Sequence, residues 1–511
     1  HVSTFDANDT VLESQWYADR GAPDPGRPLP VDLSGRLTVT PDFRAAWLAA
    51  RHAGTPSLSI LDSLGRAVIA IAHNRVEDAE GRHEFGGQRH RDERYLTYTK
   101  LDAEGKALWI RDARSNLVMQ YIWPPKANND ASDAVPAAGV PCYDMAGKLL
   151  FQHSMDGGDR WMMNDAAGKP MFGWDSRANL LTSRYDGLQR PTTLELNNPA
   201  HPDTIVVGLT QYGESTAAAQ ANNRRGKPYR SFDQSGVVTS QAFDFKGNLH
   251  IASRRLASSY AVDTDWRGVL ALPLTDEPDL LLMPVAQTFT QITEYDALSR
   301  MTLQYHWHRT GQPVAVYQPG YNARGMLDRE TLTLGAVKEL AGYSGGQRTV
   351  VIDSVTHDAK GQRLHLALGN GVGTTYAYDP TTFRLLTLVS ARPGKPDLQR
   401  LSHTYDPCGN ITDIADDAVP TQFFNGAVIE PRKRYVYDAL YRLTEAAGRE
   451  HAGQLNLGAS DNWNDCPCRV DYGAANAQAW RNYTQHTRYD SVGNILAMQH
   501  SALGDSSQSW T

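Results

Sequence analysis

The chain has few cysteines, no long apolar run and no excess of basic charge. Its 511 residues include 4 cysteines, too few for a disulfide framework in a chain of this length. No stretch approaches the roughly 20 apolar residues that a membrane-spanning helix needs. Asp and Glu number 57 against 50 Lys and Arg, which gives a net charge of −7. We therefore expect neither nucleic-acid binding nor direct membrane insertion.

The sequence also lacks the motifs that carry chemistry. Cys466 and Cys468 form a Cys-Pro-Cys without the two further ligands of a zinc site beside them. His306 and His308 lie two residues apart on one strand face and are at most half a metal site. The glycines in 369–373 lack the spacing of a phosphate-binding loop, and no Gly-x-Ser-x-Gly is present. We expect no metal, no cofactor and no catalytic residue, so the protein is not predicted to be an enzyme.

What the sequence does contain is a repeat. An aromatic or apolar residue precedes Asp, two variable residues follow, and then come Gly, a residue such as Asn, Arg or Lys, and an aliphatic residue. Four clear copies contain Tyr143, Asp144 and Gly147; Phe243, Asp244 and Gly247; Tyr405, Asp406 and Gly409; and Tyr489, Asp490 and Gly493. Looser copies contain Tyr185 and Asp186, Tyr295 and Asp296, Tyr378 and Asp379, and Tyr437 and Asp438, and others begin at Phe5, Leu61, Leu101, Trp174, Phe232, Tyr321 and His357.

The spacing of the repeat predicts a meander of strands and tight turns. Asp102 and Asp112 are 10 residues apart, and Asp233 and Asp244 are 11 apart. One strand and one turn fit this length. The Asp carboxylate can accept backbone N–H groups of the turn, and Gly three residues later tolerates a positive φ. The repeated Asp residues are therefore predicted to be structural, because a carboxylate pair for hydrolysis would not need about fifteen copies.

Alternation along the strands predicts a sheet with one apolar and one polar face. In residues 301–307, Met301, Leu303, Tyr305 and Trp307 fall on one face and polar side chains on the other. Such a sheet suits the wall of a shell.

The repeats run from end to end, so residues 1–511 are predicted to form one continuous repeat segment. A short helix is expected at 41–52, where Thr40 is the cap and Pro41 the first helical residue. Two more short helices are expected at 214–223 and 474–481, and a surface loop at 124–141. The chain begins without Met and shows no signal peptide, so we expect a fragment of a longer protein.

Several longer segments support a resemblance to the tyrosine–aspartate (YD, or RHS) repeat family, which includes teneurins and bacterial polymorphic toxins. Within that family they are similar to the B component of ABC-type insecticidal Tc toxin complexes. These segments are Ser14–Gly21, Asp159–Pro170, Gly369–Pro380, Arg434–Leu443 and Gly448–His451.

The resemblance implies an all-β fold, in which a long antiparallel sheet of repeats spirals into a hollow shell or part of one. It implies a structural function, the enclosure of a cytotoxic effector before delivery into target cells. The implied partners are a C component, which completes the shell and carries the enclosed toxic region, and a pentameric A component. Contact with the A component is expected through parts outside this chain. The implied location is a secreted, extracellular toxin complex made in the bacterial cytoplasm.

Two other functions stay open from the sequence alone. A teneurin-like adhesion module would use exposed loops such as 124–141 or 461–482 for binding. A carbohydrate-active or other hydrolase has no motif in its support.

Overall fold

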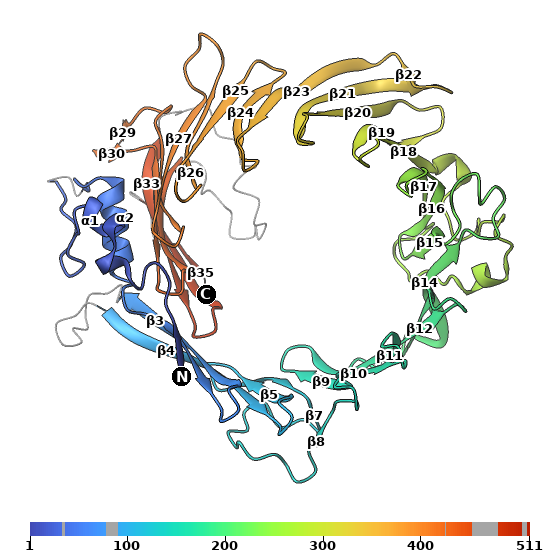
Figure 1. Cartoon of the computed structure of the whole chain (residues 1–511), viewed down its shortest axis with the longest axis horizontal. Helices are drawn as coiled ribbons and strands as arrows, with labels where there is room; N and C mark the ends of the chain where they lie inside the picture. Colours follow the sequence, from blue (N-terminus) through green and yellow to red (C-terminus); the bar gives the residue numbers. More distant parts are fainter. Residues whose placement is uncertain (33–35, 78–89, 425, 452–478, 503–507, 511) are drawn as a thin grey trace. The chain divides into compact units, whose positions relative to one another are not determined.

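The computed structural model (Figure 1) describes residues 1–32, 36–77, 90–424, 426–451, 479–502 and 508–510. These residues form mainly antiparallel strands with a few short helices, so the prediction of an all-β fold with a large antiparallel sheet is confirmed. The chain divides into two compact units. Unit 1 comprises residues 1–118, 126–134 and 373–511, and unit 2 comprises residues 119–125 and 135–372.

Unit 1 opens with a helical region. It contains η1 (Val11–Glu13), α1 (Gln15–Asp19) and α2 (Pro41–Ala50). Helix α2 begins as the sequence indicates, because the Thr40 hydroxyl accepts a hydrogen bond from the Phe43 amide at 3.2 Å and Pro41 occupies the first turn. It ends at Ala50, two residues before the expected end.

The strands of unit 1 come from the two ends of the chain. β1 to β5 pair antiparallel in sequence order. In the later part β25 to β28 pair in order, β28 pairs with β31, and β31 to β35 continue in order. The bounds are β1 (Val2–Thr4), β2 (Ser57–Leu61), β3 (Ala67–Glu77), β4 (His90–Leu101), β5 (Ala107–Arg111), β6 (Leu117–Gln120), β25 (Gly373–Tyr378), β26 (Leu385–Ala391), β27 (Gln399–Tyr405), β28 (Ile411–Asp416), β29 (Gln422–Phe424), β30 (Ala427–Ile429), β31 (Arg432–Tyr437), β32 (Leu443–His451), β33 (Trp480–Tyr489), β34 (Ile495–Ala502) and β35 (Gln508–Trp510).

Unit 2 is a meander in which each strand from β9 to β21 pairs with the next. β21 then pairs with β23, and β23 with β24. The bounds are β7 (Ile122–Trp123), β8 (Val140–Pro141), β9 (Phe151–Ser154), β10 (Gly158–Asn164), β11 (Pro170–Asp175), β12 (Leu180–Tyr185), β13 (Pro191–Asn198), β14 (His201–Tyr212), β15 (Pro228–Asp233), β16 (Gly236–Phe243), β17 (Leu249–Leu256), η2 (Arg267–Ala271), η3 (Val285–Gln287), β18 (Phe289–Tyr295), β19 (Met301–Arg309), β20 (Val314–Tyr321), β21 (Leu327–Lys338), β22 (Tyr343–Ser344), β23 (Gln347–His357) and β24 (Arg363–Leu368).

The segment 257–288, which we call the excursion, covers one sheet face of unit 2. Trp266 of the excursion is fully buried, and its ring lies 5.0 Å from that of Phe232 on β15. The core at this contact comprises Val206, Leu209, Phe232, Val237, Trp266, Val269 and Leu282. Two buried sheet arginines hold the excursion in place, since Arg230 and Arg255 both contact Glu277.

Some local expectations differ from the structure, and one falls mostly outside the described residues. Residues 214–223 form successive turns, such as Thr216 N–H to the Gly213 carbonyl, where a helix was expected. The range 474–481 lies mostly outside the described residues, and Trp480 begins β33. Trp307 is 42% exposed, although alternation placed it with the apolar face. The loop at 124–141 ends in the short strand β8, which pairs with β7.

The repeat turns share a left-handed residue three positions after the Asp. At this position φ is +87° at Gly361 and +105° at Gly409. Residues with side chains also adopt it, with φ +64° at Gln189 and +61° at Ser299. The strand register also shifts at the aromatic residue that precedes the Asp, as between Arg184 and Tyr185. A type I turn closed by a left-handed residue and a bulge is the usual three-residue hairpin.

We expect Gly361→Ala to lower the free energy of unfolding by about 1 kcal/mol, because a Cβ disfavours positive φ. The nearest contact to the added Cβ would be Met326 Sδ at an ordinary 3.5 Å, so backbone strain dominates. Gly187→Ala is the matched control, since that turn glycine has no positive φ and open space around it. Denaturant unfolding of both variants measures the difference; equal losses would contradict the assignment of strain to position 361.

Candidate functional site: the aromatic–aspartate turn ladder

The Asp carboxylate organises each turn. Asp186 Oδ1 accepts hydrogen bonds from the backbone amides of Leu188 and Arg190, each at 2.9 Å. The backbone adds two more bonds, from Asp186 N to the Arg190 carbonyl at 3.0 Å and from Gln189 N to the Asp186 carbonyl at 2.9 Å. One carboxylate therefore caps the donors that a three-residue turn leaves without strand partners.

The same Oδ1 contact to the amide four residues on recurs along the chain. It is made by Asp62, Asp102, Asp112, Asp144, Asp165, Asp175, Asp186, Asp244, Asp296, Asp358, Asp406, Asp438 and Asp490. Gly147, Gly247, Gly409 and Gly493 take positive φ in their turns.

Three of the copies deviate. Asp379 accepts from the amides of Thr381 and Thr382 and its own amide reaches Arg384, so this turn is one residue longer. Asp233 sits in a tighter hairpin, in which it pairs with Gly236. Asp6 caps the amides of Asn8 and Asp9 near η1 and is not part of a strand hairpin.

The second carboxylate oxygen binds the side chain four residues on. Arg300 Nε donates to Asp296 Oδ2 at 2.7 Å. Asn410 Nδ2 donates to Asp406 Oδ2 at 2.8 Å in the same way. Asn and Arg recur at that position because both side chains carry an N–H donor that can reach the carboxylate.

An aromatic ring at the end of the neighbouring strand completes this turn, although Tyr212, which ends β14, is followed by Gly213 and not by Asp. The Arg190 guanidinium lies 3.8 Å from the centre of the Tyr212 ring, and Tyr212 donates its hydroxyl to the Pro191 carbonyl at 3.0 Å. Tyrosine is therefore suited to the position, because its ring packs and its hydroxyl bonds the preceding turn. The same hydroxyl contact joins Tyr185 to Pro170, Tyr405 to Leu385, Tyr437 to Ile411 and Tyr489 to Leu443.

Other aromatic positions use part of this pattern. Phe243 has no hydroxyl, and Lys227 Nζ lies 4.3 Å from its ring. The Tyr143 ring tilts against Tyr121 at 6.3 Å. Tyr295 and Tyr378 occupy the same register position, at the bulge that ends a strand.

The turn hydrogen bonds lower the pKa of the Asp186 and Asp296 carboxyls. The pKa of Asp296 lies below its ordinary value because the Arg300 side chain and backbone amide both donate to it. The pKa of Asp186 is lowered in the same way, first by the Arg190 amide and then by its guanidinium. Hydrogen bonds from the backbone amide and the guanidinium stabilise the ionised form in each case.

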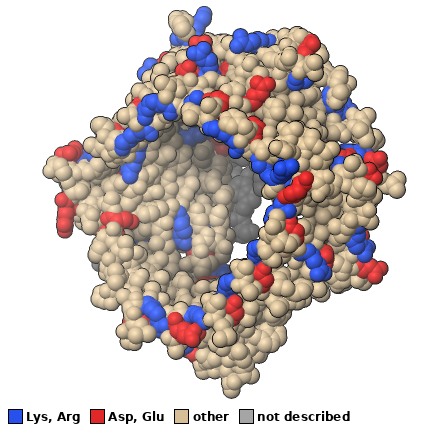
Figure 2. Space-filling model, turned by 45° about the vertical axis from the view of Figure 1, so that its right-hand side comes forward, with Lys and Arg blue, Asp and Glu red and all other residues tan. Residues whose placement is uncertain are grey.

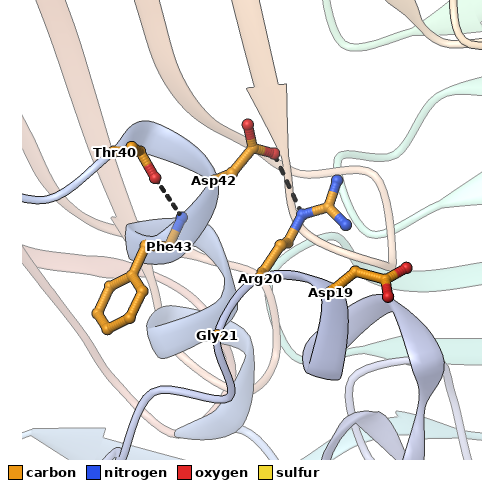
Figure 3. A pocket seen from close by; sticks show the side chains of 6 residues that line it. All are labelled: Asp19, Arg20, Gly21, Thr40, Asp42 and Phe43. Atoms are coloured by element: carbon orange, nitrogen blue, oxygen red, sulfur yellow. Dashed lines mark hydrogen bonds and ion pairs between the residues drawn. The ribbon is translucent and has the colours of Figure 1, made fainter.

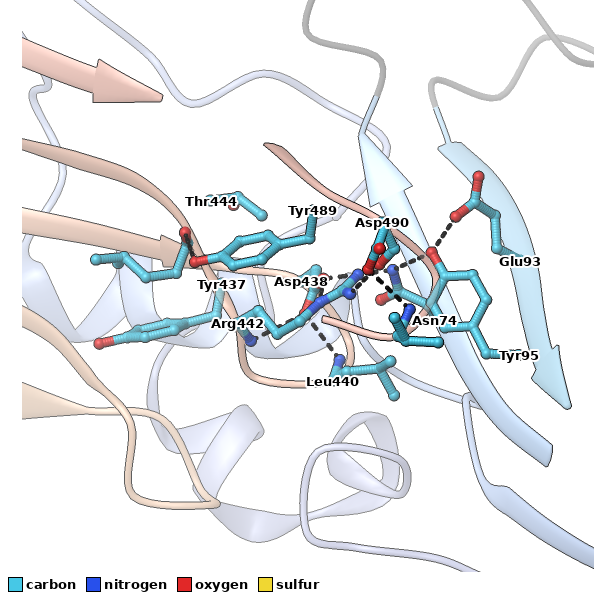
Figure 4. A network of polar contacts seen from close by, with 12 residues as sticks. Asn74, Glu93, Tyr95, Tyr437, Asp438, Leu440, Arg442, Thr444, Tyr489 and Asp490 are labelled. Carbon is cyan, nitrogen blue, oxygen red and sulfur yellow. Dashed lines mark hydrogen bonds and ion pairs between the residues drawn. The ribbon is translucent and has the colours of Figure 1, made fainter. Parts of the chain in front are cut away.

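Two of these carboxylates also bind the beginning of the chain within unit 1. Asn74 on β3 donates to Asp438 Oδ2 at 3.3 Å, and to the Tyr95 hydroxyl (Figure 4). Arg442 binds the same oxygen at 2.7 Å and reaches the Asp490 carbonyl. The cluster therefore joins β3 and β4 to the turns before β32 and β34.

Asp406 makes the corresponding contact to the first residues of the chain. It is 3% exposed, and Asn8 Nδ2 donates to its Oδ2 at 2.9 Å. Helix α2 adds a buried arginine, since Arg44 donates to the Thr412 carbonyl at 2.8 Å and to Tyr435 O at 3.3 Å. Burial lowers the pKa of Arg44 to about 10.

A shallow cavity of about 380 Å³ lies between α1 and α2 (Figure 3). Its charged groups already have partners: Arg20 Nε donates to Asp42 Oδ1 at 3.1 Å, and Asp19 accepts from Gln15 on α1. Thr40 is occupied as the helix cap. The cavity presents no nucleophile with an adjacent base.

In the part of the chain that the structure describes, no group of three His, Cys, Asp or Glu could hold a metal ion, and no helix is long and apolar enough to cross a membrane. Cys142 and Cys408 are free, and Cys466 and Cys468 lie outside the described residues. Figure 2 shows basic and acidic residues interspersed on the visible face, without a patch of one sign.

The sequence interpretation missed one copy and all of the contacts to the first residues. Asp32 Oδ1 accepts from the Arg36 amide at 3.0 Å, and Val31 pairs with Leu37. The pattern was readable, because apolar Val31 precedes Asp32 and both Gly35 and Arg36 follow at the repeat positions. The roles of Asn8 and Asn74 carry no local signal, because Asn8 is a variable position of the loose copy that begins at Phe5 and Asn74 lies outside the repeats.

Comparisons with known proteins agree with this fold. No protein-family model matches the chain. It is 26% identical over 463 residues to toxin subunit YenC1 of Yersinia entomophaga, covering 89% of this chain and 42% of that protein. It is 27% identical over 470 residues to toxin subunit YenC2 of the same organism, covering 88% and 43%. The chain thus spans less than half the length of these curated relatives.

Solved structures show the same architecture. The TcdB2-TccC3-TEV crystal structure matches with a TM-score of 0.73 and 22% identity, covering 99% of this chain and 21% of the other. The Tc holotoxin pore of Photorhabdus luminescens matches with a TM-score of 0.74 and 22% identity, covering 99% and 20%. The chain is homologous to the Yersinia toxin subunits and shares the fold of these Tc toxin structures, which confirms the predicted resemblance to Tc toxin components.

Replacing Tyr212 with Phe should lower the free energy of unfolding by about 1 kcal/mol, the usual contribution of one hydrogen bond. The substitution removes the hydroxyl bond to Pro191 and leaves the ring under Arg190. Tyr260→Phe in the same unit is the control, because Tyr260 is fully exposed. Chemical denaturation compares the two variants. An unchanged free energy of unfolding for Tyr212→Phe would show that the hydroxyl does not stabilise the turn.

Acid should destabilise the turns. Because the folded-state pKa of Asp186 and Asp296 lies below the ordinary value, their contribution to stability is present above about pH 4 and is lost as pH falls through the lowered pKa. The double variant Asp186→Asn and Asp296→Asn should show a shallower fall in melting temperature between about pH 5 and about pH 2. Asp203→Asn, outside the repeat turns, should keep the wild-type slope, and a wild-type slope in the double variant would refute the assignment.

Proposed function

We propose that this chain is the RHS-repeat wall segment of a toxin-complex subunit and that it encloses and shields a cytotoxic effector before delivery. The observation that carries the proposal is the series of turns capped by a repeat Asp, which recurs in both units of a chain homologous to toxin subunits. Each repeat is held by its neighbours, so the wall needs no bound guest for its stability. The function is confinement, with no catalytic step by this chain.

The proposed partners follow from the same relatives. The sequence pattern resembles a B component, whereas both curated relatives are named YenC. We assign this segment to the same part of the complex as the residues of those subunits that it matches. A complementary shell component would lie beside it. Contact with a pentameric A component would be made by parts of the complex outside this chain. The complex would be made in the bacterial cytoplasm and act outside the cell.

A protease-protection experiment tests confinement. The natural full-length subunit would be produced with its effector region and complementary shell component, and then digested with a nonspecific protease. We expect the effector region to survive while the same region produced alone is degraded. Equal rates of degradation would refute enclosure. Binding of cells by the isolated chain would instead favour the adhesion alternative.

A matched pair of variants locates the protection in the wall. Arg44→Ala removes the buried hydrogen bonds from α2 to the carbonyls of β28 and β31. It should therefore accelerate digestion of the effector region. Arg184→Ala removes an arginine with a 60% exposed side chain and should leave the digestion rate unchanged. Equal digestion rates in the two variants would argue against unit 1 as part of the barrier.

A further inference from the structure

His52 is a buried histidine that joins the start of the chain to a late strand of unit 1. It follows helix α2 and is 8% exposed. Its Nε2 lies 3.0 Å from the Tyr437 carbonyl oxygen, which can only accept, so Nε2 carries a proton and donates the hydrogen bond. Its Nδ1 is buried and has no hydrogen-bond partner. The contact therefore suits the neutral ring, because a second proton on Nδ1 would meet no acceptor.

Other described histidines differ from His52, because a carboxylate oxygen lies beside a ring nitrogen. A proton added to such a ring is met by a negative charge, so its uptake does not break the contact. These pairs are His73 with Asp92, His153 with Asp159, His201 with Asp263 and His500 with Glu450, at 2.6–3.3 Å. His52 has no such ion pair within the described residues, so protonation of its ring has the opposite effect.

The late turns near His52 do not supply the missing acceptor. The carboxylates of Asp406 and Asp438 attract a charge on the ring, and the Tyr441 ring meets it edge-on with centroids 6.2 Å apart. Both carboxylates already accept hydrogen bonds from their own turns and from an asparagine of the early chain. Arg442 also pairs with Asp438. A cation at His52 would therefore gain only distant attraction from these groups.

The early chain adds charges that disfavour a cation at His52. Arg51 precedes His52 and opposes its protonation. Arg75 on β3 donates to the carbonyls of Arg51 and Ala53, on either side of His52 in the sequence, at 3.1 and 2.9 Å. Burial is the largest effect and lowers the pKa of His52, and Arg51 adds to it, whereas the Tyr437 carbonyl and the two carboxylates oppose it.

The helical region of unit 1 packs as one body that includes His52. Apolar side chains of η1, α1 and α2 form a single core. This body contacts the late turns and strands through Asn8, Arg44 and His52, and the Asp6 carboxylate adds a contact to Tyr441. Among these groups only the imidazole changes its charge between about pH 7.5 and about pH 5.

We propose that His52 is an acid-sensitive switch, which holds the helical region on the late turns while its ring is neutral and releases it when the ring is protonated. Because the folded-state pKa lies below the ordinary value, the stabilisation is complete above about pH 6.5 and is lost as pH falls towards the lowered pKa. Repeat carboxylates such as Asp186 keep their charge down to about pH 4, so the strands stay paired while the helical region leaves. The switch uses contacts within this chain and holds whether or not the proposed function is correct.

Hydrogen exchange of the α2 amides in the natural full-length protein tests the switch. Rates are corrected for the pH dependence of chemical exchange and compared at about pH 7.5 and about pH 5. We expect the protection of residues 45–50 to fall by up to about 30-fold at the lower pH, the limit for one group that is neutral while buried and has an ordinary pKa when released. His52→Gln keeps an amide donor for the Tyr437 carbonyl and takes up no proton, so its protection should stay constant.

Two controls separate the switch from general effects of acid. His486→Gln replaces a histidine whose side chain is 44% exposed, and it should respond like the wild type. The amides of β20 in unit 2 should be equally protected at both pH values. Equal wild-type protection of α2 at both pH values would overturn the proposal. An equal loss in His52→Gln, or a loss in β20 as large as that in α2, would overturn it as well.

Cys408 provides a second measurement that needs no variant at position 52. Its Sγ lies 3.1 Å from the Tyr441 hydroxyl, which also contacts Asp6 next to the helical region. In a protein whose other cysteines are replaced by Ser, the reaction of Cys408 with dithiodipyridine would be measured relative to a cysteine peptide at each pH. The relative rate should rise by up to about 30-fold at about pH 5. An unchanged relative rate would overturn the proposal even if His52→Gln does not fold.

Discussion

The whole architecture depends on one carboxylate per repeat. At Asp186 one oxygen closes the turn through the Leu188 and Arg190 amides, and the other binds the Arg190 guanidinium. That guanidinium lies over Tyr212, whose hydroxyl returns to the chain beside Arg190. The carboxylate thus determines the direction of the chain and positions the cation for the next ring. Because these contacts of Asp186, Arg190 and Tyr212 reach only neighbouring strands, strands can be added in series without a common centre.

This local bonding explains which features the sequence could predict. The hairpin turns, the positive φ and the strand order follow from residues within one repeat, so Asp, Gly and their spacing suffice. The contacts of Asn8 and Asn74 join residues separated by 398 and 364 positions and follow no period. Residues 214–223 show a different limit: their Ala-rich composition favours a helix, but the carbonyls and amides close short turns instead.

The two faces of the sheet also differ in a way that alternation cannot predict. Periodicity assigns a residue to a face, but burial depends on what covers that face. In unit 2 the excursion covers Phe232 and Val237 with Trp266 and leaves Trp174 on the same face exposed. Trp307, assigned to the apolar face, is exposed for another reason: a register shift between Thr290 and Ile292 puts His308, and not Trp307, on the face of Tyr305. The segments that cover a sheet face are insertions between repeats, and the repeat pattern does not specify where they lie.

The carboxylate of Asp406 shows how the repeat interaction serves a second purpose. It is 3% exposed and accepts from the Gly409 and Asn410 amides and from Asn410 Nδ2, all neutral donors. A buried carboxylate without a cation needs its remaining acceptor sites filled, and Asn8 fills one. Asp438 differs, because Arg442 supplies a charge before Asn74 adds its bond. The contacts between the chain's first residues and its late turns therefore use carboxylate lone pairs of Asp406 and Asp438 that the turns themselves do not use.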